Sequence, residues 1–305
     1  MSNNPLVSIV VVTYNSSEFV LETLESAKIQ TYKNIELIVT DDCSKDNTLE
    51  IVKDWVDKNK DSFIHTLVLE ATVNTGISGN CNRGCNASKG EYIKTIAGDD
   101  TLETNAITDL IDYLHINPSV SLVFGQVTII NEKSEKIELV QRKIANRQIT
   151  FDHEFRSNMI HAPAIFFSRS IYDKVKGFDE NLKVEDIDYY LRILANDGII
   201  EYIEKPIAGY RMHSSNISKD SSMMLQEHIK TLDKHKKRKN YQWNYIKFTE
   251  NVLFKQKIDN RDFKFSKFYK VLSHNHLFVN LIFFDVYFWL KYFFKMKMKN
   301  LLKRV

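Results

Sequence analysis

Two adjacent aspartates, Asp99 and Asp100, follow a hydrophobic stretch that predicts a buried strand over Glu91–Ala97. Neighbouring carboxylates repel each other, and a bound cation relieves the cost of that repulsion. Hard divalent cations such as Mg²⁺ take oxygen ligands, usually one or two carboxylates together with substrate phosphates. The pair therefore indicates a divalent-metal site. The competing interpretation is structural, with Asp100 or Thr101 capping the helix that is expected next.

The loops after two earlier predicted strands carry side chains suited to a ligand. The segment "TYNS" (13–16) follows the β-branched run Leu6–Val12, and its Tyr14 could stack on a nucleobase. The segment "TDDCSKDN" (40–47) follows the second strand, and Asp42 could accept a hydrogen bond from a base N–H. As turn or cap residues, the same side chains need no ligand. Three such loops at the carboxyl ends of parallel strands favour a ligand site.

Glycine spacing limits the kind of ligand. The sequence has neither the G-x-G-x-x-G dinucleotide turn after its first strand nor a P-loop anywhere. Both absences argue against a nicotinamide or ATP site.

Two later segments add polar groups. In "VEDIDYYLR" the i, i+4 spacing of Asp188 and Arg192 predicts an ion pair within one helix. Glu185 and Asp186 stand at the start of that helix, where the macrodipole favours carboxylates. The segment "YRMHSSNIS" (210–218) adds a cation and a histidine.

These residues need a scaffold, and the sequence predicts an α/β fold in which strands and helices alternate. The expected strands are Leu6–Val12, Ile35–Thr40, Phe63–Leu69, Glu91–Ala97 and Val120–Ile130, and the expected helices are 17–30, 46–57, 77–88 and 103–116. Ser17 and Asp46 are the expected caps of the first two helices. This alternation predicts a mostly parallel, Rossmann-like sheet with helices on both faces.

Beyond Asn131 the alternation ends. Residues 131–160 are polar and are expected to be irregular. Further elements are expected as a strand within 162–170, a helix over 184–197, a short strand over Ile199–Ile203 and helices from 221 onward.

Charge is distributed unevenly along the chain. Residues 229–305 hold 19 Lys and Arg against 5 Asp and Glu, whereas residues 1–228 hold 23 against 34. The apolar, aromatic stretch 277–294 is interrupted by Asp285, which disfavours a membrane-spanning helix. We expect a helix in the membrane interface, with its lysines at anionic headgroups. The alternative is a helical pair that packs on the catalytic domain or on a second subunit.

Cysteine usage and the N-terminus indicate the compartment. Cys43, Cys81 and Cys85 are too few for a disulfide framework and lack metal-type spacing. The N-terminus has no positive n-region, so no signal peptide is expected. Both features favour a reducing cytoplasm.

Five segments in order resemble glycosyltransferase family 2, whose members are inverting enzymes with a GT-A fold. They are "VSIVVVTYNS", "ELIVTDDCSKDNT", "NTGISGNCNRGCNASKGEYIKTIAGDD", "GFDENLKVEDIDYYLR" and "YRMHSSNIS", spread over about residues 6–218. The resemblance implies a GT-A catalytic domain over 1–220, with a nucleotide-sugar-binding half (1–130) and an acceptor-binding half (131–220). A helical, basic and aromatic C-terminal region, 221–305, would follow.

The resemblance also implies residue roles. The donor-binding residues that it implies are Thr13, Tyr14, Asn15, Asp42, Asn82, Arg83, Asp99, Arg211 and His213. Asp99 would face the ribose, and Asp100 would bind the Mn²⁺ or Mg²⁺ that bridges the diphosphate. His213 would lie near the diphosphate or serve as a metal ligand. Asp186 would be the general base, and Glu185 would help to orient the acceptor.

The sequence departs from the family pattern at two positions. Ala97 stands where many members have the first Asp of an Asp-x-Asp-Asp segment. Cys81 precedes Asn82 where many members have Arg, so a phosphate contact is lost there or is supplied by Arg83.

The activity that the resemblance implies is transfer from a nucleotide sugar, such as a UDP-linked hexose or N-acetylhexosamine, to a saccharide hydroxyl, forming a β-glycoside. The tail suits a polyprenyl-diphosphate-linked acceptor, as in O-antigen or capsule synthesis, at the inner face of the cell membrane. A homodimer through the C-terminal helices stays open. The alternative from another class is a nucleotide-binding scaffold without turnover. The basic run at 233–240 is expected to be a solvated helix face and not a nucleic-acid site.

Overall fold

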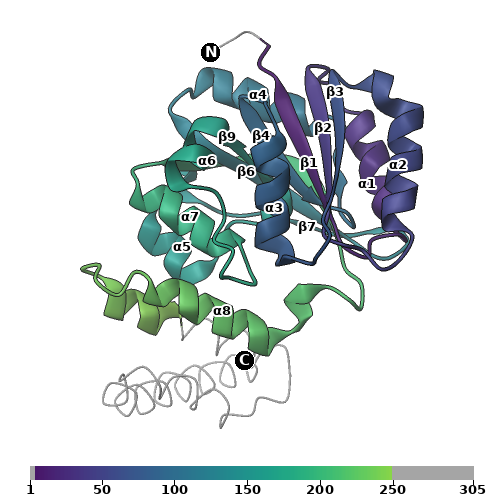
Figure 1. The fold of residues 1–305 in the computed structure, drawn as a ribbon. Helices are drawn as coiled ribbons and strands as arrows, with labels where there is room; N and C mark the ends of the chain where they lie inside the picture. The colour runs from purple at the N-terminus through teal and green to yellow at the C-terminus, as the bar shows by residue number, and fades with distance from the viewer. Residues whose placement is uncertain (1–3, 249–305) are drawn as a thin grey trace, which may run out of the picture. The chain divides into compact units, whose positions relative to one another are not determined.

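A ten-stranded sheet forms the centre of the structure, a computed structural model that describes residues 4–248 (Figure 1). The strands are β1 (Val7–Thr13), β2 (Ile35–Asp41), β3 (His65–Glu70), β4 (Tyr92–Ala97), β5 (Thr101–Leu102), β6 (Val120–Ile130), β7 (Lys136–Val140), β8 (Gln148–Ile149), β9 (Ile165–Ser168) and β10 (Ile199–Arg211). The α-helices are α1 (Val20–Lys28), α2 (Thr48–Asn59), α3 (Gly76–Ala87), α4 (Ala106–Ile116), α5 (Phe151–Ser157), α6 (Arg169–Val175), α7 (Asp186–Ala195) and α8 (Ser221–Asp233).

The strand order combines a parallel half with a mixed half. The main order is β3-β2-β1-β4-β9-β6-β10-β5, and the first four strands run parallel to one another. β9 joins the two halves because it pairs antiparallel with both β4 and β6, whereas β10 runs parallel to β6. The expected α/β fold with helices on both faces is therefore confirmed. The antiparallel strands are an addition that the alternating pattern did not indicate.

Both faces of the parallel half are buried, which explains its uninterrupted β-branched runs. Val7, Ile9 and Val11 of β1 pack in one hydrophobic cluster, which includes residues of α1, α2 and α4. Val10, between them, belongs to a second cluster with Ile38 and with residues of α3, α6 and α7. Successive side chains of a strand point to opposite faces, so one strand supplies both clusters.

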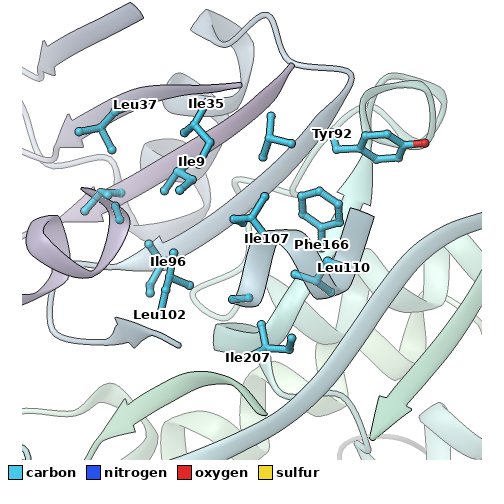
Figure 2. Packing of buried hydrophobic residues seen from close by; sticks show 14 of the residues in the cluster. Ile9, Ile35, Leu37, Tyr92, Ile96, Leu102, Ile107, Leu110, Phe166 and Ile207 are labelled. Atoms are coloured by element: carbon cyan, nitrogen blue, oxygen red, sulfur yellow. The ribbon is translucent and has the colours of Figure 1, made fainter. Parts of the chain in front are cut away.

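Figure 2 shows part of the first cluster, where residues from both halves of the sheet meet one helix. Ile9 and Ile96 come from the parallel half, Phe166 and Ile207 come from β9 and β10, and Ile107 comes from α4. The two halves therefore share a continuous core, which fixes the edge of the sheet where the strand-end loops emerge.

The segment 131–160 is more regular than its polar composition indicated. β7 is an exposed strand that pairs antiparallel with β6, and α5 begins after Thr150, whose side chain accepts a hydrogen bond from the His153 N–H. The expectation of an irregular segment was wrong. An edge strand open to solvent on its outer side can carry charged residues, so its pattern resembles a loop.

β10 is also longer than expected, because it continues from Ile203 to Arg211 through Pro206. The pairing register with β6 shifts on both sides of Pro206. Such an irregularity accommodates a residue without an N–H inside a sheet. Glu204, Lys205 and Pro206 interrupt the apolar pattern of this strand, so the sequence predicted only its first part.

The two expected helix caps differ in outcome. The Ser17 prediction was wrong, because α1 begins at Val20 after Phe19, and the Ser16 carbonyl accepts the Phe19 and Val20 N–H groups. Asp46 does bond the start of α2, since its Oδ1 accepts from the Thr48 backbone N–H at 3.1 Å. The same carboxylate accepts from the Ser17 N–H, so it links two strand-end loops.

The C-terminal region is described as far as residue 248. Within residues 4–248 no helix is both long enough and apolar enough to cross a membrane. The expected interfacial helix at 277–305 lies outside the described residues.

Candidate functional site

Strand register brings three polar loops to one edge of the sheet. Val12 of β1 pairs with Thr40 of β2 on one side and with Ala97 of β4 on the other. The loops that begin at Tyr14, Asp42 and Gly98 therefore leave the sheet at about the same level. The carboxyl ends of parallel strands are where ligands of such sheets bind.

The capping interpretation of the two aspartates was wrong. The next helix, α4, begins only at Ala106, with Asn105 in the capping position. Asp100 Oδ1 instead accepts the backbone N–H of Arg211 at 2.9 Å, and the Asp100 side chain is buried. Asp99 keeps about a quarter of its side chain exposed.

Burial and the charge of Asp99 raise the pKa of the Asp100 carboxyl well above its usual range. A cation beside Asp100 would favour its ionised form and relieve that cost. Among the described residues, no three His, Cys, Asp or Glu side chains converge as ready metal ligands. The residues present would suit a Mg²⁺-type ion that takes one or two protein carboxylates together with substrate phosphates.

His213 lies against Asp99. Its Nε2 is 2.9 Å from Asp99 Oδ2, and its Nδ1 is 2.7 Å from Ser215 Oγ. The Phe19 ring packs on the imidazole with centroids 5.1 Å apart. The chain thus fixes the ring plane, and both ring nitrogens face polar partners.

Arg211, expected among the donor-binding residues, is fully buried behind the aspartates. Its Nε donates to the Asp99 carbonyl, and its terminal nitrogens contact Glu22 Oε2 at 2.6 Å and Ser134 Oγ at 2.8 Å. The Phe19 ring lies 4.8 Å from the guanidinium carbon. The structure brings Arg211 to the aspartates and surrounds its guanidinium with protein groups.

The Asp42 carboxylate holds the start of α3. It accepts hydrogen bonds from the Thr75 N–H and hydroxyl and from the Gly76 N–H at 2.7–3.0 Å. Arg83, expected near a phosphate, pairs with Asp42 at 3.1 Å and reaches Asn80 Oδ1 at 2.7 Å. Asp42 and Arg83 therefore lie together at the edge formed by β2 and α3.

The loop after β1 contains an exposed tyrosine ring, Tyr14, and an ordered turn at Asn15. The Tyr14 side chain is 48% exposed, as a stacking platform requires. Asn15 adopts a left-handed conformation (φ 51°), and its Oδ1 accepts the Lys45 N–H at 2.8 Å. Thr13 Oγ1 donates to Asp41 Oδ1 at 2.9 Å, which ties this loop to the second one.

Asn82 is not brought to the strand ends. Its Nδ2 donates to the Phe178 carbonyl and to Glu180 Oε1, both at 2.9 Å, and its Oδ1 accepts from the Phe178 N–H and the Tyr172 hydroxyl. These four bonds use the full capacity of a carboxamide. Asn82 therefore anchors α3 to the segment that precedes α7.

Glu185 and Asp186 stand at the N-terminus of α7, as expected. Burial raises the pKa of Asp186 to about 6, whereas burial and the neighbouring Asp186 charge raise the pKa of Glu185 to about 8. The Ile187 N–H donates to Asp186 Oδ1 at 2.7 Å and favours its ionised form. Two adjacent buried carboxyl groups disfavour double ionisation, so the pair retains a proton at a higher pH than an isolated carboxyl would.

The predicted ion pair on α7 is confirmed, with Arg192 Nε 2.6 Å from Asp188 Oδ2. Asp188 is fully buried and also accepts from Lys234 Nζ at 2.7 Å. Both contacts hold the helix that carries Glu185 and Asp186.

Two groups near the carboxylates were missed from the sequence. Burial raises the pKa of the Tyr210 phenol, the hydrogen bond with Ser218 lowers it, and the charges of Asp100, Asp99 and Asp186 raise it further. Burial raises the pKa of the Glu154 carboxyl to about 8, and the Asp186 charge acts on it as well. Tyr210 adjoins Arg211 in the "YRMH" segment and could have been considered as a site residue. Nothing in the sequence around Glu154 indicates such a role.

A family model described as glycosyl transferase family 2 matches residues 8–176, more than half of the chain. An uncharacterized glycosyltransferase of Methanocaldococcus jannaschii is 26% identical over 251 residues, which cover 81% of this chain and 84% of that protein. Chondroitin synthase of Escherichia coli is 27% identical over 232 residues, which cover 75% of this chain and 32% of the synthase.

Solved structures share the fold at low sequence identity. The crystal structure of S. aureus TarS in complex with UDP-GlcNAc has a TM-score of 0.61 and 17% identity, covering 80% of this chain and 71% of that chain. The mannosyltransferase PcManGT from Pyrobaculum calidifontis, in complex with GDP-Man and Mn²⁺, has a TM-score of 0.61 and 16% identity, covering 90% and 81%. At these identities the likeness shows the fold alone.

Proposed function

Because this chain belongs to glycosyltransferase family 2, we propose that it transfers a sugar from a nucleotide sugar to a saccharide hydroxyl with inversion. The observation that carries the proposal is the strand register that brings Tyr14, Asp42 and the Asp99–Asp100 pair to one edge of the sheet. Asp186, at the start of α7, would add a base whose pKa burial raises to about 6, and a nucleotide-binding module alone would not require such a group.

The donor base is proposed to stack on Tyr14 and to contact Asp42. Tyr14 is exposed, and Asp42 lies at the end of the adjacent strand. A base N–H would share the Asp42 carboxylate with the N-terminus of α3. Thr13 and Asn15 shape the loop, and Arg83 supports Asp42. A UDP-linked hexose or N-acetylhexosamine is the donor that we propose, since TarS binds UDP-GlcNAc; PcManGT binds GDP-Man, so the nucleotide needs testing.

Asp100 is proposed to hold a Mn²⁺ or Mg²⁺ together with the donor diphosphate, and His213, whose Nε2 contacts Asp99, is the other candidate ligand. A divalent cation in that position offsets the charge of the leaving diphosphate. Asp99 is proposed to face the ribose, with its other side held by His213. PcManGT was solved with Mn²⁺, which supports a metal in this fold.

Asp186 is proposed to take the proton of the acceptor hydroxyl as that oxygen attacks the sugar. A carboxylate that is ionised near neutral pH can do so within hydrogen-bond reach. Glu185, whose pKa burial and the Asp186 charge raise, is proposed to orient the acceptor through a hydrogen bond. Direct displacement with one base inverts the anomeric centre, so an α-linked donor would give a β-glycoside.

We propose that residues 131–220 bind a saccharide, carried on a polyprenyl diphosphate for surface-polysaccharide synthesis at the inner face of the cell membrane. The basic, aromatic sequence 277–305 supports this membrane contact or, alternatively, a homodimer through the C-terminal helices.

The test is nucleotide release from a panel of UDP-, GDP- and dTDP-sugars, with Mn²⁺ or with EDTA. The proposal expects release from one nucleotide class that depends on the metal. Tight nucleotide binding without release from any donor, with or without saccharide acceptors, would instead identify a non-catalytic scaffold.

A further inference from the structure

Arg211 is a buried cation whose contacts come from three separate parts of the chain. It is fully buried. Its guanidinium meets Glu22 of α1 and Ser134 of the β6–β7 turn, and its Nε donates to the Asp99 carbonyl. The Asn131 carbonyl accepts a further bond at 3.1 Å. A guanidinium engaged in this way has little capacity left for a diphosphate.

Glu22 supplies the charge that this cation needs. A buried guanidinium is costly unless an anion and further acceptors compensate it. Glu22 Oε2 lies 2.6 Å from Arg211 and also accepts the Ser134 hydroxyl at 2.6 Å. Glu22, Ser134 and Arg211 therefore form a closed triangle of charge-assisted bonds. Glu22 itself is 44% exposed, on a helix outside the strand-end loops.

The other side of Arg211 holds the aspartate turn at two points. Its backbone N–H donates to Asp100 Oδ1, and its Nε donates to the Asp99 carbonyl. Helix α1 adds a third point, since Thr23 Oγ1 donates to the Asp100 carbonyl at 2.6 Å. The turn thus receives its orientation from Arg211 and α1.

We propose that Glu22 and Ser134 are positioning residues for Asp99 and Asp100, acting through Arg211, and that the Arg211 guanidinium does not bind the donor. The inference rests on the proposed function, because it assigns the aspartate turn to the donor diphosphate and its metal. The geometry of the turn, however, is measurable in the free protein and without any donor.

The first test is amide hydrogen exchange of residues 97–102 in Glu22→Ala and in the more conservative Glu22→Gln. Exchange there should become about tenfold faster in Glu22→Ala, with Glu22→Gln between it and the wild type. Glu25→Ala is the matched control, because Glu25 lies on the same helix but bonds Trp55 and Lys28 instead. Unchanged protection of 97–102 in Glu22→Ala, or an equal loss in Glu25→Ala, overturns the inference.

The second test separates metal-dependent from metal-independent nucleotide binding by calorimetry. Glu22→Gln should weaken UDP binding measured with Mn²⁺ about fivefold and leave UDP binding in EDTA within about twofold of the wild type. Ser134→Ala should act in the same direction. Equal weakening in both conditions would contradict a role through the aspartate turn. If the wild type fails to bind any nucleotide or release it from a donor, the proposed function fails while the exchange result still decides the positioning role.

Discussion

His213 Nε2 lies 2.9 Å from Asp99 Oδ2, although the two residues are 114 positions apart in the sequence. The neighbouring Asp100 carboxylate receives the Arg211 backbone N–H instead. Two adjacent like charges therefore have different surroundings: one is tied to an imidazole and partly exposed, and the other is buried. This difference supports separate roles for the two carboxylates at the donor.

The rate of transfer should depend on the ionisation of Asp186. Its pKa is raised to about 6, and the base acts only when ionised. kcat/KM should therefore rise with pH through an apparent pKa near 6 and level off at neutral pH. The measurement is nucleotide release between about pH 5 and pH 8, with donor affinity measured in parallel. A midpoint near 4, or a donor affinity that follows the same curve, would contradict the assignment.

Glu154→Gln should make the protein more stable at alkaline pH. Burial raises the pKa of Glu154 from 4.5 to about 8, so the folded state retains a proton that the unfolded state has lost. Wild-type stability should therefore fall between those pH values, by up to about 1.4 kcal/mol per pH unit for this one group. The glutamine, which can still accept the Met159 N–H, removes that slope. Urea unfolding at several pH values is the measurement, and parallel slopes for both proteins would refute the prediction.

Lys234→Met should weaken the attachment of the segment after α8 to α7. Lys234 contacts Asp188 at 2.7 Å and donates to Asp179, whose pKa it lowers to about 2. The ion pair between Lys234 and Asp179 contributes its full stabilisation above the unfolded-state pKa of Asp179, 3.8. That contribution disappears as the pH falls towards about 2 and Asp179 becomes protonated. The expected cost at neutral pH is about 1–2 kcal/mol. Urea unfolding of Lys236→Met, a change at an exposed lysine, provides the control and should match the wild type.

Tyr14→Ala should weaken nucleotide binding, while Tyr14→Phe should preserve it. The exposed ring offers a stacking surface, and stacking of a base on an aromatic side chain contributes about 1–3 kcal/mol. Calorimetric titration with UDP should show roughly tenfold weaker binding for the alanine variant. Equal affinity for all three proteins would mean that the base lies elsewhere.

The loops of the candidate site could be predicted because parallel strands produce a simple signal. β-Branched runs buried on both faces mark β1 and β2, and the polar residues that follow them must share one edge. For the same reason the sequence was sufficient to single out Asp99 and Asp100 as candidate ligands. The α7 ion pair between Asp188 and Arg192 was predictable because it is local in sequence.

The parts that could not be predicted depend on contacts between distant segments. Arg211 was expected among the donor-binding residues, and its partners Glu22 and Ser134 are 189 and 77 positions away in the chain. Asn82 matched a motif position, yet its side-chain amide forms its hydrogen bonds with the loop before α7. Glu154 is a charged residue on a short helix, and only the fold shows that this side is buried.

The Asp186→Asn variant tests the central claim most directly. Asparagine keeps the size and the hydrogen-bond acceptor of the side chain but cannot take a proton, and loss of a general base costs about 10²–10⁴-fold in rate. The measurement is nucleotide release with donor, Mn²⁺ and acceptor, together with donor affinity. Asp197→Asn, an exposed change beyond the far end of the same helix, is the control and should retain full rate. We predict at least a hundredfold loss in Asp186→Asn with unchanged donor affinity, and wild-type turnover by that variant would contradict the mechanism.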